Sequence, residues 1–232
     1  MSEIDRATMI GTHAIAHQRP PMPTSPDIRF WDKAARKYAA RPVGDEAGLE
    51  RTLARTRELL PAGARVLELG CGTASSALRL APHAGRIVAS DASGEMIAIA
   101  REKVAQAGVA NVEPVQATAD AVPEAPGGYD AVIAFNLLHL VPDRAALYAR
   151  VRALLAPGGV FVSKTPCLSE MNPAIRLVVP LMRLIGKAPS VAWFDAKALE
   201  AEIVAAGFSI VERDRHGSGK SDPRLFLVAR AP

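Results

Sequence analysis

The sequence predicts an α/β fold of the doubly wound class, in which helices cover both faces of a mostly parallel sheet. Between residues 65 and 163, short apolar runs alternate with helical stretches. Turn residues bound each run, as is typical of strands buried on both faces. The last two apolar runs are joined by a polar loop without a helix. Those two strands must pair as an antiparallel hairpin, because a parallel return needs a crossover.

Composition supports one ordinary globular domain. The chain has 232 residues, of which 49% are hydrophobic and 22% are charged, enough to bury a core without disulfides. Its two cysteines, Cys71 and Cys167, have no metal-site spacing, so we expect no metal and a reducing, cytoplasmic setting. The first ten residues carry Glu3 and Asp5 and lack the pattern of a signal peptide. A net charge of +4 without a concentrated basic patch disfavours a nucleic-acid partner.

The two ends of the chain flank the alternating region. Residues 1–26 are proline-rich towards their end and lack periodicity, so we predict a flexible leader. The single domain is predicted to span residues 27–232. Apolar residues at steps of four predict a helix over Asp27–Ala40, and a second helix over Asp45–Leu60 ends at Pro61.

The alternating region and the end of the chain supply the remaining elements. The predicted buried strands are Arg65–Leu69, Arg86–Ser90, Val112–Ala117, Tyr129–Phe135 and Gly159–Ser163. The helices between them lie near Ala74–Leu80, Gly94–Ala107 and Pro142–Ala156. A last helix over Asp195–Ala206 precedes the hairpin strands Phe208–Arg213 and Leu225–Arg230.

An insertion over residues 172–194 contains no acidic residue. We expect a helix that begins at Asn172 and Pro173, ends at Gly186 and kinks at Pro180. The three basic residues of the insertion fall within about 40° of one another on the helix surface, at about 100° per residue. They are Arg176, Arg183 and Lys187.

Two interpretations of this insertion stay open. An ordinary surface helix would pack its apolar side on the domain and leave the basic stripe in water. Alternatively, the helix covers an apolar substrate pocket, and residues 172–194 contact an anionic membrane surface.

The first predicted strand ends in a glycine-containing turn, VLELGCGTA. Gly70 and Gly72 allow a ligand to approach the backbone closely. Ser75 stands where a dinucleotide-binding fingerprint needs a third glycine, which disfavours a nucleotide-dependent reductase. Glu68 lies near the end of a buried strand, so its carboxylate should face a cationic ligand or hydrogen-bond donors. A structural glutamate bonded to backbone amides is the alternative.

The second predicted strand ends at Asp91, which lies 21 residues after Gly70. An acid at this place binds the two ribose hydroxyls in nucleotide-binding sheets. Asp91 or Ser93 could equally cap the next helix. Together with Glu68 and the glycines, Asp91 favours a nucleoside ligand.

Taken as a set, these motifs resemble those of the class I S-adenosylmethionine-dependent methyltransferases of the small-molecule type. The matching segments are VLELGCGTA, SDAS, YDAVIAFNLLHLVPD, LLAPGGVFVS and the terminal hairpin, which together cover about residue 30 to the end. The resemblance implies a Rossmann-like, seven-stranded sheet whose seventh strand is antiparallel. It also implies S-adenosyl-L-methionine as the cofactor and methyl transfer as the activity.

The resemblance also implies which residues contact the cofactor. Those assigned to the methionine part are Glu68, Gly70, Cys71 and Gly72. Asp91 corresponds to the ribose acid, Ala92 and Met96 flank the adenine, and Asn136 lies beside the sulfonium. Thr118, followed by Ala119, replaces the common aspartate that bonds the adenine amino group.

On the acceptor side, His139 is the candidate general base, because its titration range suits proton abstraction near neutral pH. A histidine that only packs or caps the turn is the alternative. Five of the eleven aromatic residues lie in the predicted lid segments 27–42 and 166–194, where an apolar acceptor would enter. They are Phe30, Trp31, Tyr38, Trp193 and Phe194. Tyr38 is the candidate for a catalytic contact.

The sequence therefore predicts methyl transfer to a small, apolar or amphipathic acceptor such as a quinone, phenol or lipid. A nucleotide-dependent reductase and a non-catalytic S-adenosylmethionine-binding protein are the alternatives on the same fold. An aminopropyl transferase would need further acids at the tip of the fourth strand, which reads Asn136, Leu137, Leu138, His139. The acceptor atom and the oligomeric state are not predicted.

Overall fold

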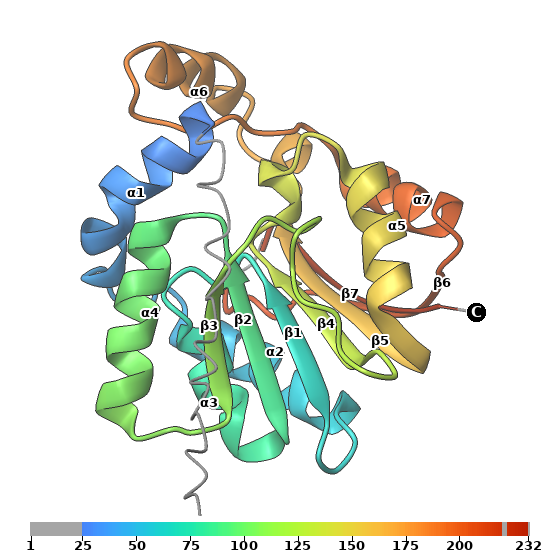
Figure 1. Ribbon diagram of the computed structural model, residues 1–232. Helices are drawn as coiled ribbons and strands as arrows, with labels where there is room; N and C mark the ends of the chain where they lie inside the picture. The colour runs from blue at the N-terminus through green and yellow to red at the C-terminus, as the bar shows by residue number, and fades with distance from the viewer. Residues whose placement is uncertain (1–24, 220–221, 232) are drawn as a thin grey trace, which may run out of the picture.

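The computed structural model describes residues 25–219 and 222–231 and contains one seven-stranded sheet flanked by helices (Figure 1). The strand order is β3-β2-β1-β4-β5-β7-β6. The strands are β1 (Arg65–Leu69), β2 (Arg86–Asp91), β3 (Val112–Gln116), β4 (Tyr129–Phe135), β5 (Leu155–Pro166), β6 (Ser209–Asp214) and β7 (Arg224–Arg230). The predicted leader, residues 1–26, lies almost wholly outside the described residues.

Seven α-helices connect or flank these strands in the described part of the chain. They are α1 (Pro26–Ala39), α2 (Glu46–Leu59), α3 (Ser75–Leu80), α4 (Gly94–Ala107), α5 (Arg144–Leu154), α6 (Ile175–Leu184) and α7 (Ala196–Ala205). Three short 3-10 helices are Ala81–His83, Leu138–Leu140 and Leu168–Glu170. The predicted order of strands and helices is confirmed.

The pairing pattern confirms the predicted sheet. Strands β1 to β5 pair in parallel, whereas β7 pairs antiparallel with both β5 and β6. The fifth strand is longer than predicted and begins directly after α5, at Leu155. Its register against β4 shifts between Tyr129 and Ala131. Gly158, which precedes the predicted start of the strand at Gly159, therefore lies inside β5.

Alternate residues of the central strands feed two separate cores, one on each face of the sheet. In β4, Val132 and Ala134 pack with the helices α5 and α7. Their neighbours Ile133 and Phe135 pack on the opposite face with α2, α3 and α4. This period of two is the geometry of a strand buried on both sides.

Helix α1 packs against α4 through a third, smaller cluster. Ala35 of α1 is buried with Met96 and Ile99 of α4, and Trp31 packs against them. The Ser25 side chain caps α1 by accepting a hydrogen bond from the Ile28 amide. This docking holds the predicted N-terminal lid segment beside the carboxyl ends of β1 and β2.

Helix α6 stands clear of the sheet beside α1 (Figure 1). It begins two residues later than predicted, with Ala174 instead of Asn172 as its N-cap, because Asn172 Oδ1 accepts from the Ala174 amide in a turn that precedes the helix. The end is as predicted: Gly186 has a φ of 67°, and Lys187 N donates to the carbonyl of Met182. Among the residues that the structure covers, no helix is both long and apolar enough to cross a membrane.

The sheet order reverses direction between β1 and β4, with β2 beyond β1 on one side and β5 beyond β4 on the other. In open α/β sheets, ligands bind in the crevice outside the carboxyl ends of the strands at this point. The motifs at the ends of β1, β2 and β4 therefore meet at one place.

Candidate active site

The turn between β1 and α3 brings several residues into the left-handed region of backbone conformation. Gly70, Gly72 and Ala74 have φ values of 65°, 53° and 57°. The positive φ of Gly70 favours glycine there, and a Cβ would also lie 2.7 Å from Cδ1 of Leu137 at the tip of β4, which would then have to move. The Cys71 amide donates to the Ser90 carbonyl over 2.9 Å, which fixes this turn to the end of β2.

Glu68 is the most unusual side chain of the site. It is 3% exposed, and its Oε2 atom has no hydrogen-bond partner. Burial, supported by the nearby Asp91 carboxylate, raises the pKa of Glu68 to about 8, although the Ala77 amide opposes the rise. An unpaired buried carboxylate is costly, so this oxygen fits a cationic or hydrogen-bond-donating group of a ligand.

Asp91 faces the same turn from the end of β2. Its carboxylate accepts from the amides of Gly72, at 2.9 Å, and Ser93, at 2.8 Å. Burial raises the pKa of Asp91, and these two amides oppose that rise. Ser93, not Asp91, caps α4, because its hydroxyl accepts from the Met96 amide. The helix-cap alternative for Asp91 is therefore excluded, which leaves its remaining lone pairs free for a ligand.

The tip of β4 carries a second strained residue. Asn136 is exposed and has a φ of 52°, a conformation that costs a non-glycine residue about 1–3 kcal/mol. Its amide donates to the Lys164 carbonyl of β5 over 2.7 Å. Strain of this kind persists only where the surrounding structure imposes it, and it gathers at functional sites.

His139 follows Asn136 in a short 3-10 turn. Burial lowers its pKa to about 4, so the imidazole is neutral at physiological pH. Its buried Nδ1 atom has no hydrogen-bond partner. The His139 carbonyl accepts from the Ala192 amide over 2.7 Å, which ties this turn to the segment after α6. A neutral ring with an unused nitrogen can accept a proton or a hydrogen bond.

Tyr38 of α1 lies over the glycine turn. A Cβ on Gly72 would be 3.7 Å from Tyr38 Cε1 and 4.0 Å from Met96 Sδ. The Tyr38 pKa is raised by burial and then by the carboxylates of Glu68 and Asp91. Tyr38 therefore belongs spatially to the Glu68–Asp91 half of the site, although 48% of its surface is exposed.

The other predicted contacts lie around the same turn. The Ala92 carbonyl accepts from Gln116 Nε2. The Ala117 amide donates to the Asp91 carbonyl, and this bond places the half-buried Thr118 and Ala119 next along the chain. Burial and the two carboxylates raise the Cys71 pKa, so its thiol stays protonated. No metal-binding group of three or more His, Cys, Asp or Glu residues occurs among the described residues.

Two contacts of the site connect elements far apart in sequence and were not predicted. Asp32 of α1 accepts from the Ser93 hydroxyl over 2.6 Å, and thus orients the cap of α4. Lys103 of α4 donates to the Thr73 hydroxyl over 2.8 Å. Neither residue belongs to a motif, so only the docking of α1 and the path of α4 reveal them.

The predicted gathering of aromatics at an acceptor entrance is wrong for Phe194. That ring is 4% exposed and belongs to the core beneath α5 and α7. The guanidinium of Arg144 lies 4.7 Å above its centroid. Phe30, Trp31 and Tyr38 form a chain of edge-to-face contacts along α1, whereas Trp193 lies half-buried near α6.

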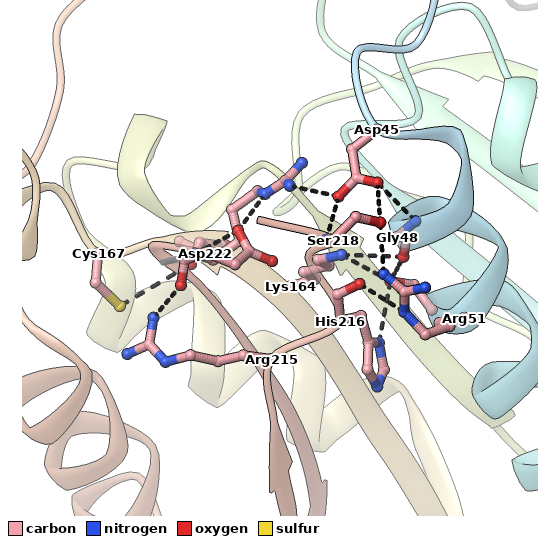
Figure 2. A network of polar contacts seen from close by, with 12 residues as sticks. Asp45, Gly48, Arg51, Lys164, Cys167, Arg215, His216, Ser218 and Asp222 are labelled. Atoms are coloured by element: carbon pink, nitrogen blue, oxygen red, sulfur yellow. Dashed lines mark hydrogen bonds and ion pairs between the residues drawn. The ribbon is translucent and has the colours of Figure 1, made fainter. Parts of the chain in front are cut away.

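A polar network behind the site joins α2, β5 and the residues between β6 and β7 (Figure 2). Lys164 Nζ donates to the Thr52 hydroxyl over 2.8 Å, and His216 Nδ1 lies 3.1 Å from the same oxygen. Asp45 accepts from both the amide and the hydroxyl of Ser218. Because the Lys164 carbonyl accepts from Asn136, this network supports the strained strand tip.

Comparisons with known proteins agree with this geometry. A family model described as a methyltransferase domain matches residues 66–159. A demethylmenaquinone methyltransferase from Clavibacter sepedonicus is 34% identical over 69% of this chain and 72% of its own length. The chain belongs to the class I S-adenosylmethionine-dependent methyltransferase family.

Two further family members differ in how far the match extends. A ubiquinone biosynthesis O-methyltransferase from Xanthomonas axonopodis pv. citri is 35% identical over 65% of this chain, which spans only 61% of that protein. The fold also matches an S-adenosylmethionine-dependent methyltransferase structure from Aquifex aeolicus. That match has a TM-score of 0.66 and 18% identity, and it covers 87% of this chain and 98% of the other.

The buried Glu68 carboxylate should lower stability in the absence of ligand. Its folded pKa of about 8 exceeds the usual value of 4.5, so the folded state retains a proton that the unfolded state loses. The free energy of unfolding should therefore fall as pH rises from 4.5 to 8, by about 5 kcal/mol at most. In Glu68→Gln, this pH dependence should be lost, as measured by urea denaturation at pH 5, 6.5 and 8.

The exposed Glu102 of α4 provides the control. Glu102→Gln should follow the wild-type protein across the same pH range. If the wild type and Glu68→Gln lost stability in parallel between pH 5 and 8, burial of Glu68 would not be the source of the pH dependence.

Proposed function

We propose that the protein transfers a methyl group from S-adenosylmethionine to a small, apolar or amphipathic acceptor of the quinone or phenol type. The observation that carries the proposal is the buried, unpaired Glu68 oxygen at the point where the strand order reverses. Asp91 and the left-handed glycine turn lie beside it, and Asn136 and His139 occupy the neighbouring strand tip. This combination fits a ligand that is both cationic and a nucleoside.

The residues on the β1 and β2 side would hold the cofactor. Glu68 would bind a cationic group of its methionine part, and Asp91 would accept hydrogen bonds from the ribose hydroxyls. The backbone at Gly70 and Gly72 leaves room for close approach, with Tyr38 and Met96 beside it. When bound, S-adenosylmethionine supplies an activated methyl group on a sulfonium leaving group. Catalysis by the chain then consists mainly of in-line positioning.

The acceptor would lie at the tip of β4. The names of the two curated relatives refer to ubiquinone biosynthesis and demethylmenaquinone, which supports a quinone-type acceptor. For a hydroxyl acceptor, the unpartnered Nδ1 of His139 would take up the proton as the oxygen attacks the methyl group. The pKa of about 4 keeps His139 in the neutral, proton-accepting form at neutral pH but makes it a weaker base than an ordinary histidine, so proton uptake would have to accompany attack by the oxygen.

Residues 27–42 and 166–194 would act as lids over the acceptor. The Ser190 amide donates to Asp27 Oδ1 over 2.8 Å, so the two segments touch each other. In this scheme residues 27–232 work as a single methyltransferase domain in the cytoplasm, with no nucleic-acid partner.

A non-catalytic S-adenosylmethionine-binding protein and a nucleotide-dependent reductase are the competing functions. Isothermal titration calorimetry with S-adenosylhomocysteine should give micromolar binding, and Glu68→Gln should weaken it at least tenfold at pH 7, unlike Glu102→Gln. Labelled methyl transfer to a panel of quinones, phenols and lipids should then identify an acceptor. Binding of NADPH in place of S-adenosylhomocysteine would favour the reductase. Cofactor binding without any methyl incorporation would favour the non-catalytic protein.

Replacing the candidate base tests the acceptor half alone. His139→Gln should lower turnover of a hydroxyl acceptor by roughly 100-fold, since general bases contribute factors of this order. Binding of S-adenosylhomocysteine should be unchanged by calorimetry. His83→Gln, on an exposed 3-10 turn, should retain wild-type turnover. Full activity of His139→Gln on its true acceptor would exclude a catalytic role for this residue.

We further propose that α6 contacts an anionic membrane surface, from which an apolar acceptor would be taken. Leu177, Leu181, Leu184 and Ile185 are 80%, 63%, 84% and 60% exposed. The insertion around them carries only basic charges. An amphipathic helix with these two properties is typical of membrane-surface binding.

Flotation with vesicles tests the membrane contact. The protein should float with phosphatidylglycerol-containing vesicles and less with neutral vesicles. A Leu177→Asp, Leu181→Asp double variant should remain at the bottom of the gradient while still binding S-adenosylhomocysteine. Equal flotation of wild type and double variant would contradict the contact.

A further inference from the structure

A groove lies between α6 and the segment that returns from it to the domain. Helix α6 ends at Leu184, Gly186 follows in the left-handed conformation, and residues of the segment 189–193 line the groove together with the helix. The groove has a volume of about 530 Å³. Its apolar lining consists of Val179, Pro180, Leu184, Pro189, Val191 and Trp193. Arg183 is its one charged lining residue.

The lining of the groove is apolar and poor in hydrogen-bond donors, and helix α6 leaves the groove open. No residue of α6 is buried, and the groove lies between the helix and the segment that follows it. Pro180 and Pro189 contribute rings without a backbone N–H, which leaves the lining poor in hydrogen-bond donors. Arg176 lies 5.7 Å from the Trp193 ring centroid. A ligand in this groove would meet hydrocarbon on both sides.

One wall of the groove is hydrogen-bonded to the turn that carries His139. The Ala192 amide, between the lining residues Val191 and Trp193, donates to the His139 carbonyl over 2.7 Å. The neighbouring Ser190 amide donates to Asp27 of α1. One wall of the groove is thus fixed to the turn that carries the candidate base and to the helix that carries Tyr38.

We propose that this groove binds the hydrocarbon side chain of the methyl acceptor, while the reactive ring lies at His139. The proposal rests on the proposed methyl transfer to a quinone or phenol, and it adds that the preferred acceptor carries a long, uncharged chain. Arg183 is the charged residue of the lining, so a cationic or sugar-like substituent would find no matching partners among the lining residues and would be costly to bury. A volume of this size is within the usual range for bound small molecules.

Acceptors with one head group and chains of increasing length test the groove by kinetics. Each methylene that becomes buried should raise kcat/KM by about fourfold until the groove is full. Val179→Asp should raise KM for the longest chain at least tenfold and leave the chainless head group unchanged. Val178→Asp, the same change on the adjacent and 50% exposed residue that does not line the groove, should leave both values unchanged.

A binding assay makes the test independent of turnover. Trp31 and Trp193 are the two tryptophans of the chain, so Trp31→Phe leaves Trp193 as the sole reporter. A phenol with a bromine at the end of a decyl chain should quench Trp193 fluorescence in a saturable way. Val179→Asp in this background should abolish the quenching, and Val178→Asp should retain it. Circular dichroism and S-adenosylhomocysteine binding verify that each variant is folded.

The outcomes separate this proposal from the proposed function. Saturable, Val179-dependent quenching without methyl transfer to any acceptor would support the groove and overturn the function. The groove proposal would be overturned, and the proposed function retained, by two results together: a rate of methyl transfer that does not depend on chain length, and quenching that Val179→Asp does not change. A dimer in sedimentation that only Val179→Asp disrupts would assign the groove to a second copy of the chain and also overturn the proposal.

Discussion

The buried Glu68 carboxylate is the constraint around which the rest of the structure is arranged. It lies where the strand order reverses, on a strand whose other residues are all apolar except at its start. The low polarity of the two cores on either side of the sheet makes an ionised carboxylate unfavourable in the isolated protein, so burial raises the pKa of Glu68 to about 8 and favours its protonated form at neutral pH. The same low polarity would strengthen the attraction to a cationic ligand. Stability and cofactor binding are thus opposed at this one residue.

Backbone strain is also found at this edge of the sheet, next to Glu68. Ala74 and Asn136 adopt left-handed conformations that other packing must hold in place. Ala74 is fully buried at the start of α3. Asn136 is held through Lys164, whose ammonium group is anchored by the network to α2 (Figure 2). Helix α2, which belongs neither to the glycine turn nor to the tip of β4, therefore helps to keep Asn136 in its strained geometry.

The sequence predicted the bounds of those elements whose structure depends on a local pattern of residues. Strands β1 and β4 and helix α4 have the predicted bounds, because apolar runs, turn residues and the Ser93 cap are short-range signals. The glycine turn and Asp91 were found by their spacing. Other features were not predicted, because each depends on how separate elements pack. They are the irregularity of β5, the burial of Phe194, and the contacts of Asp32 and Lys103. The start of α6 was misplaced because Asn172 bonds within a turn instead of capping the helix.

The two halves of the candidate site differ in how much of the fold depends on them. Gly70, Asp91 and Met96 lie in the strands, turns and helices that build both cores, so changes there would affect folding as well as the cofactor. Helix α6 buries none of its residues and contributes little to the core. A substitution on α6 therefore has a small energetic cost for the domain as a whole. Under the proposed function, acceptor preference would change through this helix while the cofactor half stays the same, which would let one fold serve many small-molecule acceptors.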